Sequence, residues 1–453
     1  MKKLKNLPES AFLRIFFAFV SLCFVIAAFI MPDRSAAFTG LWKIMTGTCK
    51  ISTNYFALGG FSATFLNMGV VGLLCTAMCL LPGAKPNNVT TLGVLLTIGF
   101  GSWGINPLNM IPTVLGVFLY CLVKKEKLGA MSNAMLYSTG IAPLISDLLF
   151  RYPGAEYVGF NALGLLLAVF VGLIIGFFLP AGLGHAPNIH KGYDHYSAAV
   201  PIGMTAFFLR AALYNVMLGA TPAQLGLSTM AALDVVSWPM TNIFCFVVFG
   251  LCIVFALLMG CSPKDYWNLM KDSGHGVSFT TKYGNAPFLM NVGIFGLMIV
   301  AYFNLAGAID GTNVWTGMTF GIVFCMLATC NSGSHPGNVW PIMAGYIITS
   351  YLFGWINSLL GGTFALTIGN QSILIGLCYA NGLSPISGKY GIGYGMLAAG
   401  LHYLLVTAVP DMHGGFCLYN GGFTAALICL LFIPQLEKFC KTKEERKLAK
   451  AAK

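Results

Sequence analysis

Long apolar stretches, separated by short polar or glycine-rich segments, follow one another along almost the whole chain between residues 10 and 435. Fourteen of them are long enough, or nearly long enough, to cross a bilayer, since about 20 apolar residues span its hydrocarbon core as a helix. Seven lie in each half, at residues 11–31, 61–82, 89–103, 107–123, 132–150, 159–180 and 197–218, and at residues 240–260, 287–307, 314–330, 337–357, 365–385, 392–410 and 416–434. Continuous apolar runs are typical of helical spans, whereas membrane barrels alternate. The pattern therefore predicts an all-α polytopic membrane protein.

Four sparse motifs occur in the same order in both halves. They are Asn67-x-Gly69-x-x-Gly72-Leu73 and Asn291-x-Gly293-x-x-Gly296-Leu297, Gly104-x-Asn106-Pro107-x-Asn109-x-x-Pro112 and Gly333-x-His335-Pro336-x-Asn338-x-x-Pro341, Tyr137-x-x-Gly140-Ile141-x-Pro143 and Tyr379-x-x-Gly382-Leu383-x-Pro385, and His190-x-Gly192-Tyr193-x-x-Tyr196-Ser197 and His413-x-Gly415-Phe416-x-x-Tyr419-Asn420. A duplicated hydrophobic chain with helix-breaking residues at matching places is typical of solute transporters. The predicted units are two repeats at 1–218 and 240–435, a linker at 219–239 and a basic tail at 436–453. Thr221-Pro222 indicates a short surface helix in the linker.

Composition supports a membrane location and argues against other classes. The chain has 57% hydrophobic and 9% charged residues and a mean hydropathy of +0.78, whereas soluble domains carry about 25% charged residues. Much of the net charge of +11 lies in the two tails, where basic residues contact anionic lipid. We therefore expect membrane lipid as a partner and no nucleic acid. The fourteen cysteines lie mostly in apolar segments without a CxxC pair, so we expect neither metal nor cofactor.

The loop charges predict an orientation. If the amino terminus is cytoplasmic and every stretch crosses, the inside loops contain Lys85, Lys124, Lys125, Lys127, Lys191, Lys264, Lys271, Lys282 and Lys389, in addition to both basic tails. The outside loops contain only Arg34, Lys43, Lys50 and Arg151. This is the positive-inside pattern, with both termini cytoplasmic. Because seven crossings per half is an odd number, the repeats must be inverted relative to each other. Re-entrant helices that reduce the number to five would leave it odd.

The motif around Pro107 and Pro336 is the strongest candidate for a binding site. Two prolines five residues apart, preceded by glycine, break a helix and free backbone groups, and at membrane depth such groups face protein or a polar cavity. In an inverted repeat, two breaks can meet near the midplane, where transporters bind solutes. The predicted binding residues are Asn67, Asn106, Asn109, Asn291, His335, Asn338, Tyr137 and Tyr379, and the predicted helix breaks lie at Pro107, Pro112, Pro336, Pro341, Pro143 and Pro385. Alternatively, the Pro107 and Pro336 motifs are ordinary turns between short spans.

Four charged or titratable residues are candidates for coupling or gating. Asp147 is one of few acids in apolar sequence and could carry a proton; alternatively, it is an interfacial acid near Arg151. Arg210 could face an anionic solute, or it snorkels or pairs with an acid such as Asp234. His190 and His413 open the last span of each half and could gate a pore, or they cap backbone in an aromatic belt. His402, alone in mid-span, is expected to be a satisfied buried residue.

Three segments carry a family resemblance. They are His413-Gly414-Gly415-Phe416-Cys417-Leu418-Tyr419-Asn420-Gly421-Gly422-Phe423, Tyr55-Phe56-Ala57-Leu58-Gly59-Gly60 and Ser384-Pro385-Ile386-Ser387-Gly388-Lys389-Tyr390-Gly391. The chain resembles, over nearly its whole length, a bacterial integral-membrane family catalogued only as a domain of unknown function. The resemblance implies a location in the bacterial inner membrane and brings no substrate. Two inverted repeats of seven are also the layout of the nucleobase and anion transporter fold, an analogy of architecture only.

Together these features predict a secondary transporter, or a channel, for a small polar or anionic solute, which works by alternating access and could form a homo-oligomer. The repeated polar residues are uncharged, which disfavours a cation pathway. The alternative is a membrane-embedded enzyme that acts on a lipid-linked substrate. It would need clustered acids or histidines, and such a cluster occurs at His185, His190, Asp194 and His195.

Overall fold

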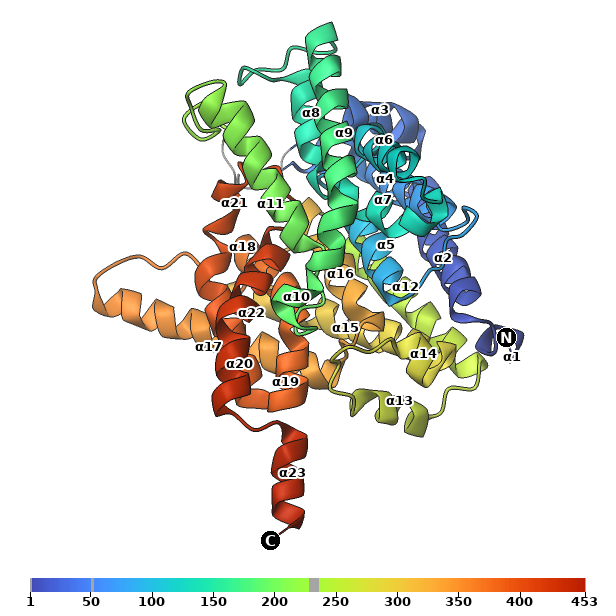
Figure 1. Ribbon diagram of the computed structural model, residues 1–453, viewed down its shortest axis with the longest axis vertical. Helices are drawn as coiled ribbons and strands as arrows, with labels where there is room; N and C mark the ends of the chain where they lie inside the picture. Colours follow the sequence, from blue (N-terminus) through green and yellow to red (C-terminus); the bar gives the residue numbers. More distant parts are fainter. Residues whose placement is uncertain (1, 50–52, 228–235, 453) are drawn as a thin grey trace.

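The computed structural model describes residues 2–49, 53–227 and 236–452. The regular elements of these residues are α-helices, 3-10 helices and one π-helix, which together form an all-helical fold (Figure 1). The first half contains α1 Lys2–Lys5, α2 Glu9–Ile30, α3 Ala37–Thr46, α4 Tyr55–Met78, α5 Asn88–Phe100, α6 Pro107–Lys124, α7 Ser132–Ser138, α8 Ala142–Phe150, α9 Ala162–His185, α10 Pro187–His190 and α11 Ala199–Arg210. The second half contains α12 Trp238–Leu258, α13 Pro263–Met270, α14 Phe279–Tyr283, α15 Asn285–Asp310, α16 Gly317–Leu327, α17 Pro336–Leu359, α18 Gln371–Ala380, α19 Ser384–Tyr390, α20 Ile392–Val406, α21 Val409–Met412, α22 Asn420–Phe439 and α23 Lys443–Ala451. Short irregular helices are η1 Arg34–Ala36, η2 Leu128–Met131, η3 Thr139–Ile141, η4 Ala211–Val216, η5 Ala328–Asn331 and η6 Asn381–Leu383.

Nine helices in the described part of the chain are long and apolar enough to cross a membrane. Three shorter apolar helices, Asn88–Phe100, Gly317–Asn331 and Ile392–Val406, account for three more of the predicted stretches. The stretches at 132–150 and 365–385 are broken into α7-η3-α8 and α18-η6-α19. The prediction of an all-helical fold is therefore confirmed, and the nine candidate spans indicate a multi-pass membrane protein. That all fourteen stretches cross the bilayer stays a prediction.

The two halves break their helices at matching glycines. Gly60 interrupts α4 with φ 87° and ψ 178°, and Gly284 separates α14 from α15 with φ 87° and ψ 172°. Each lies seven residues before the asparagine of the first motif, Asn67 or Asn291. The left-handed region favours glycine because a Cβ would clash there. At Gly60 an added Cβ would also lie 2.4 Å from Asp33 Oδ2.

The short helices α5 and α16 pack against each other in opposite directions. Both begin at a capping box, formed by Asn87 and by Thr316. The Sγ of Cys325, the ninth residue of α16, donates to the carbonyl of Leu96, the ninth residue of α5. The end of α5 meets the start of α16, where Ser102 Oγ donates to the Gly317 carbonyl at 2.7 Å. Matching residues of the two halves therefore meet near the middle of this pair. We call residues at matching places in the two halves counterparts.

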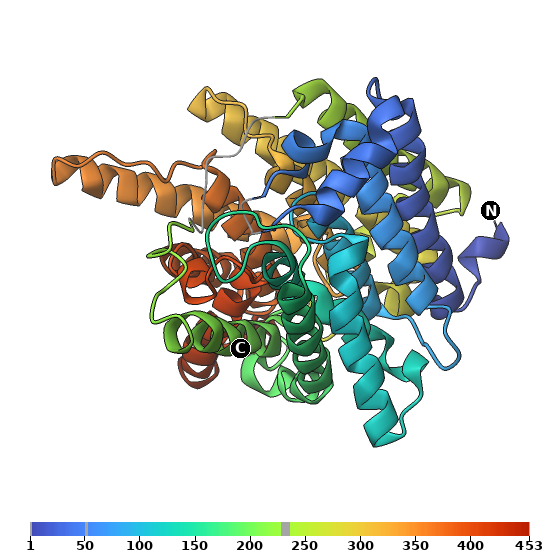
Figure 2. The ribbon, with the colours of Figure 1, turned by 90° about the horizontal axis from the view of Figure 1, so that it is seen from above.

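Matching elements of the two halves lie at opposite ends of the molecule in Figure 1. α3 and α8 lie near the top, whereas α13 and α19, which occupy the same places in the second half, lie near the bottom. Seen from above, the helices of the two halves form one body from which α17 projects sideways (Figure 2). Buried phenylalanines on α2, α4, α12 and α16 pack together in its core: Phe24, Phe65, Phe244, Phe320 and Phe324.

The predicted linker helix is only partly within the described residues. Thr221 and Gln224 exchange the two hydrogen bonds of a helix cap, and Leu227 N donates to the Pro222 carbonyl. Residues 221–227 nevertheless form turns and no assigned helix, and the remainder of the predicted segment at 228–235 lies outside the described residues. α12 begins at Trp238.

Candidate functional site

The chain leaves its helical path before Pro107 and before Pro336, and these prolines begin α6 and α17. Asn106 Oδ1 accepts hydrogen bonds from the amides of Leu108 and Asn109, both at 3.0 Å. His335 Nδ1 likewise accepts from the amide of Gly337 at 3.0 Å. Both residues are N-caps, and proline suits the first helical position because its missing N–H needs no partner there. The second prolines, Pro112 and Pro341, lie within α6 and α17.

The predicted binding asparagines hold these breaks together. Asn67 Nδ2 donates to the carbonyls of Gly101 and Ile105, at 2.7 and 2.8 Å. Asn291 Nδ2 donates to the counterpart carbonyls of Cys330 and Ser334, at 3.0 and 2.9 Å. Because all four carbonyls lie outside a regular helix, the asparagines satisfy groups that the helices leave unpaired.

Asn109 and Asn338 have the same kind of contacts. Their Nδ2 atoms donate to the carbonyls of Gly104 and Gly333, at 3.0 and 2.9 Å. Asn338 and His335 also border a cavity of about 530 Å³ whose lining includes Lys271, Lys282, Lys389 and Lys443. The other predicted amides line neither this cavity nor the two described below.

The second pair of broken helices packs against the histidine motif of the opposite half. Pro143 and Pro385 lie in the first turns of α8 and α19, after η3 and η6. The amide of His195 donates to the Gly382 carbonyl at 3.1 Å, and the amide of Leu418 donates to the Gly140 carbonyl at 2.9 Å. His195 and Leu418 are counterparts, as are Gly382 and Gly140. Each half thus fastens its final motif to the broken helix of the other.

At both of these glycines, a tyrosine ring lies too close to leave room for a side chain. A Cβ at Gly140 would lie 2.7 Å from ring atoms of Tyr419, and a Cβ at Gly382 would lie 2.6 Å from the Tyr196 ring. The two tyrosines are counterparts and fully buried. These glycines and tyrosines, for which the sequence suggested no function, therefore form the contact between the halves. Their presence in both repeats was the sequence signal for this contact.

Hydrogen bonds of the buried tyrosines differ between the two halves. Tyr196 OH donates to the carbonyls of Cys325 and Cys378, at 3.0 and 3.1 Å. The hydroxyl of its counterpart Tyr419 is buried and has no hydrogen-bond partner among the described residues. The two counterpart hydroxyl groups therefore have different surroundings.

The predicted binding tyrosines differ in the same way. Tyr379 OH donates to the Leu418 carbonyl at 2.6 Å. Its counterpart Tyr137 donates at 2.6 Å to the carbonyl of Val89 on α5, and not to that of His195, which is the counterpart of Leu418. Tyr379 therefore binds the final motif of its own half, whereas Tyr137 does not.

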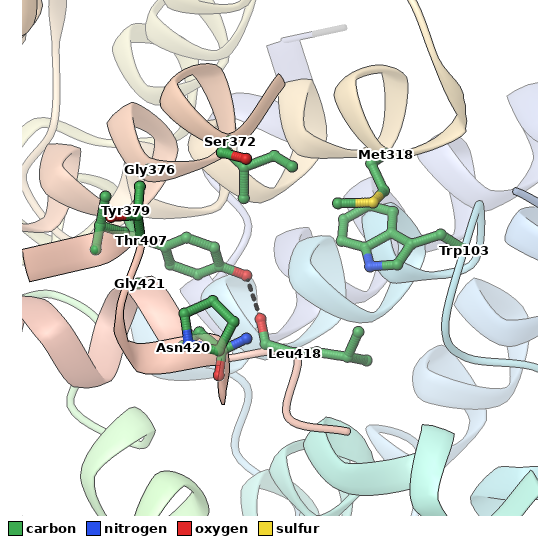
Figure 3. Close-up of a pocket in the computed structure, with 12 residues that line it drawn as sticks. Trp103, Met318, Ser372, Gly376, Tyr379, Thr407, Leu418, Asn420 and Gly421 are labelled. Atoms are coloured by element: carbon green, nitrogen blue, oxygen red, sulfur yellow. Dashed lines mark hydrogen bonds between the residues drawn. The ribbon is translucent and has the colours of Figure 1, made fainter. Parts of the chain in front are cut away.

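Two cavities with counterpart linings lie on either side of this contact. One has about 510 Å³ and the other about 70 Å³. We call them the wide and the narrow cavity. Counterparts that line them are Val89 and Met318, Asn133 and Ile375, Tyr137 and Tyr379, Pro187 and Pro410, His195 and Leu418, and Ser197 and Asn420. Figure 3 shows the narrow cavity, in which the bond from Tyr379 to Leu418 crosses between Met318 and Asn420.

The wide cavity carries the titratable groups. His190 Nδ1 accepts from the Gly192 amide at 3.1 Å, and its Nε2 lies 2.8 Å from Ser197 Oγ. Asp194 Oδ1 accepts from the Tyr196 amide at 2.8 Å, while Oδ2 is buried without a hydrogen-bond partner among the described residues. Burial raises the pKa of Asp194 to about 7. Burial also lowers the pKa of His195 to about 3, together with the nearby His190, His275 and His335.

The remaining coupling candidates line neither of the two cavities. Asp147 forms a buried ion pair with Arg151 and accepts a hydrogen bond from Tyr214 OH, so the structure has it beside Arg151, as in the second interpretation above. Arg210 Nε is buried without a partner among the described residues, and Asp234 lies outside them. His413 Nδ1 lies 2.5 Å from Asn420 Oδ1.

His402 is a satisfied buried residue, because its ring nitrogens contact Tyr346 OH and the Gly421 carbonyl. The cluster at His185, His190, Asp194 and His195 does not form a metal site: no group of three His, Cys, Asp or Glu side chains within 2–49, 53–227 and 236–452 is arranged to hold a metal ion. His185 is exposed at the end of α9 and does not line the wide cavity.

The comparisons with known proteins agree with the resemblance noted in the sequence. The family described as "Protein of unknown function (DUF1576)" matches residues 33–215 and again residues 260–438. These two ranges cover most of both halves and leave out the region between them. No curated protein and no solved structure matches the chain. Since the family matches well over half of its length, the chain belongs to the DUF1576 family of proteins of unknown function.

Proposed function

We propose that the protein is a secondary transporter that moves a small polar solute by alternating access between two inverted repeats. The observation that carries this proposal is the unequal size of the two counterpart cavities, about 510 and 70 Å³. In an inverted-repeat transporter, exchanging the conformations of the two repeats closes one cavity and opens the other. A channel would need both cavities open together, and the narrow one supports a transporter instead.

Two observations support the inversion, and a third indicates which side the wide cavity faces. α5 and α16 are counterparts and antiparallel, with Leu96 against Cys325, as a two-fold axis between them would require. α3 and α13, and α8 and α19, lie at opposite ends in Figure 1. Lys191 lies beside the lining of the wide cavity, at the end of the molecule for which the loop charges predict a cytoplasmic location. We infer that the wide cavity opens to the cytoplasm of the bacterial cell.

The lining of the wide cavity indicates the solute class. It offers amide groups of Asn88 and Asn133, hydroxyl groups of Tyr137 and Ser197, imidazoles and one carboxyl group, and none of its lining residues is lysine or arginine. Such groups suit a neutral or cationic polar molecule better than an anion. We therefore favour a small polar solute over the anionic one that the sequence left open. The membrane-embedded enzyme stays a prediction that no observation here favours.

Reporter cysteines at counterpart positions test the proposal. Asn133→Cys places a thiol in the wide cavity and Ile375→Cys places one in the narrow cavity. With a membrane-impermeant maleimide, we expect Asn133→Cys to react only from the cytoplasmic side. Ile375→Cys should react only from the opposite side and at least fivefold more slowly. The unmodified chain is the background control, since most of its cysteines are buried.

Any condition that slows labelling of Asn133→Cys should accelerate that of Ile375→Cys, because one conformational exchange controls both cavities. Labelling of both variants from the same side would contradict the inversion. Rapid labelling of both from opposite sides under one condition would indicate a channel.

A further inference from the structure

We propose that Asp194 is the proton-binding residue that couples conformational exchange to a proton gradient. This inference rests on the proposed transport function and adds the coupling ion, which the repeated motifs do not identify. From the sequence, Asp194 belonged only to the cluster of acids and histidines that the enzyme alternative requires. The carboxyl group lines the wide cavity, between the final motif of the first half and the broken helix of the second.

The carboxyl group is enclosed but only half satisfied. Its residue is 2% exposed. Oδ1 accepts the Tyr196 amide at 2.8 Å and would lie 2.5 Å from a Cβ at Gly382, so the carboxyl touches the η6 turn. Oδ2 is buried and has no hydrogen-bond partner among the described residues. A buried carboxylate with an unpaired oxygen is costly, whereas a neutral carboxyl group tolerates the same place better.

These surroundings favour a proton over a metal cation. Metal cations such as Ca²⁺ take about six to eight oxygen ligands, and in the described part of the chain Asp194 belongs to no group of three His, Cys, Asp or Glu side chains that could hold a metal ion. A proton needs only the carboxylate oxygen to which it binds. The counterpart of Asp194 is Cys417, so this site exists once, in the first half only. A single carboxyl group implies one proton for each conformational cycle.

The position of Asp194 links its charge to the state of the cavities. It is adjacent to His195, whose amide fastens the final motif to Gly382. The conformation with the wide cavity open buries the carboxyl group and so favours its protonated form. Loss of the proton leaves a buried negative charge. This charge favours a rearrangement of the contact at Gly382 that exposes the carboxylate to water or to a hydrogen-bond donor. Low pH should therefore hold the wide cavity open.

The titratable groups around Asp194 do not supply a counter-charge. His190, His195 and Tyr137 line the same cavity, and Cys429 on α22 lies near Asp194. His275 and His335 face His195 from the second half. Burial raises the pKa of Asp194 to about 7, although the Tyr196 amide opposes the rise. The carboxyl group therefore titrates in the physiological range.

The first test observes the proton directly. Infrared titration of the purified full chain should contain a protonated-carboxyl band that loses half its intensity near pH 7. The band should be absent in Asp194→Asn and retained in Asp272→Asn, whose carboxyl group is paired with Lys282. Asp194→Glu should restore a band with a different midpoint. Persistence of the full band in a folded Asp194→Asn protein, or its absence in the wild type above pH 5, would overturn the proposal.

The second test measures coupling through the reporter variants Asn133→Cys and Ile375→Cys. Their labelling rates are divided by that of the exposed Asn6→Cys variant, which corrects for thiol ionisation. From pH 8.5 to pH 5.5 we expect labelling at Asn133→Cys to rise at least threefold and that at Ile375→Cys to fall. Adding Asp194→Asn should fix both at their low-pH values.

The outcomes separate the two proposals. If the carboxyl band titrates but labelling does not depend on pH, or if Asp194→Asn keeps the wild-type dependence, the coupling role is wrong while alternating access stands. If the two reporters react from the same side of the membrane at every pH, the transport proposal itself fails. A pH dependence removed only by Asp272→Asn would assign coupling to the other acid.

Discussion

Asn67 and Asn291 each connect two carbonyl groups on either side of a helix break, and this role differs from solute binding, for which the sequence suggested them. Their amide groups are fully buried and face backbone. The residue types and their spacing predicted that polar groups cluster at the breaks. Which partner each amide would choose depended on the path of residues 101–106 and 330–335, which no local pattern encodes.

Asn67→Ala and Asn291→Ala should each destabilise the protein by about 2–6 kcal/mol, because each leaves two buried carbonyls unsatisfied at about 1–3 kcal/mol apiece. Thermal unfolding in detergent measures the change. Asn6→Ala, at an exposed position, is the matched control and should leave the melting temperature within experimental error. A loss of transport without loss of stability in Asn67→Ala would instead support a binding role.

Asp194 and His195 should give opposite slopes to the pH dependence of stability. The folded-state pKa of Asp194 is raised to about 7, so its contribution is present below about pH 4 and is lost as pH rises toward 7. The folded-state pKa of His195 is lowered to about 3, so its contribution is present above about pH 6.5 and is lost as pH falls. For each residue, the slope of the free energy of unfolding against pH is at most about 1.4 kcal/mol per pH unit.

In the wild type the two contributions largely offset each other between pH 4 and 6.5. Asp194→Asn should therefore become more stable as pH rises in this range, and His195→Gln should become less stable. Chemical unfolding at a series of pH values measures both. Parallel pH profiles for the two variants would contradict the assignment.

At the scale of elements, the sequence predicted the positions of most helices, because long apolar runs leave few alternatives in a membrane. The fourteen stretches correspond to helices or broken helices. Pro107, Pro336, Pro143 and Pro385 lie at helix starts, whereas Pro112 and Pro341, which were predicted as breaks, lie within α6 and α17. The pattern did not reveal that α5 and α16 are too short to span alone, or that Gly60 and Gly284 break helices. Both glycines are only partly buried, and hydrophobicity does not report the backbone conformation that a single glycine adopts.

The crossing of α5 and α16 depends on two glycines. A Cβ at Gly321 would lie 2.2 Å from the Gly99 carbonyl oxygen and 2.2 Å from Ser102 Oγ. Gly321→Ala should separate the helices and destabilise the protein by about 1–3 kcal/mol, as overpacking does. Gly393→Ala in α20, where an added Cβ meets open space, is the control and should not lower the melting temperature in detergent. Equal stability of both variants would contradict the close packing.

For the whole molecule, duplication and loop charge predicted two related halves with opposite orientations, but not the differences in hydrogen bonding and cavity volume between their counterpart residues. A residue has the same side chain in every conformation. The sequence alone therefore does not show which conformation each half adopts. The difference lies in hydrogen bonds such as those of Tyr196 and Tyr419 and in the volumes of the two cavities. The homo-oligomer stays a prediction, since only one chain is described.

The same difference predicts opposite effects of two matched substitutions. In the state with the wide cavity open, the single hydroxyl proton of Tyr196 lies between two carbonyl acceptors, whereas Tyr419 OH has no hydrogen-bond partner among the described residues. In the exchanged state, Tyr419 should donate to the carbonyls of Leu96 and Leu136, the counterparts of Cys325 and Cys378. Tyr196→Phe then weakens only the present state, and Tyr419→Phe weakens only the exchanged one.

Each lost hydrogen bond has a net worth of about 0.5–1.5 kcal/mol, so the population ratio should change by roughly two- to tenfold. Tyr196→Phe should increase labelling of Ile375→Cys and decrease that of Asn133→Cys, and Tyr419→Phe should do the reverse. Since both substitutions remove the same buried hydroxyl from counterpart positions, nonspecific loosening would move both reporters in one direction. Opposite changes in the two labelling rates would follow only if each tyrosine forms its hydrogen bond in a different one of the two states.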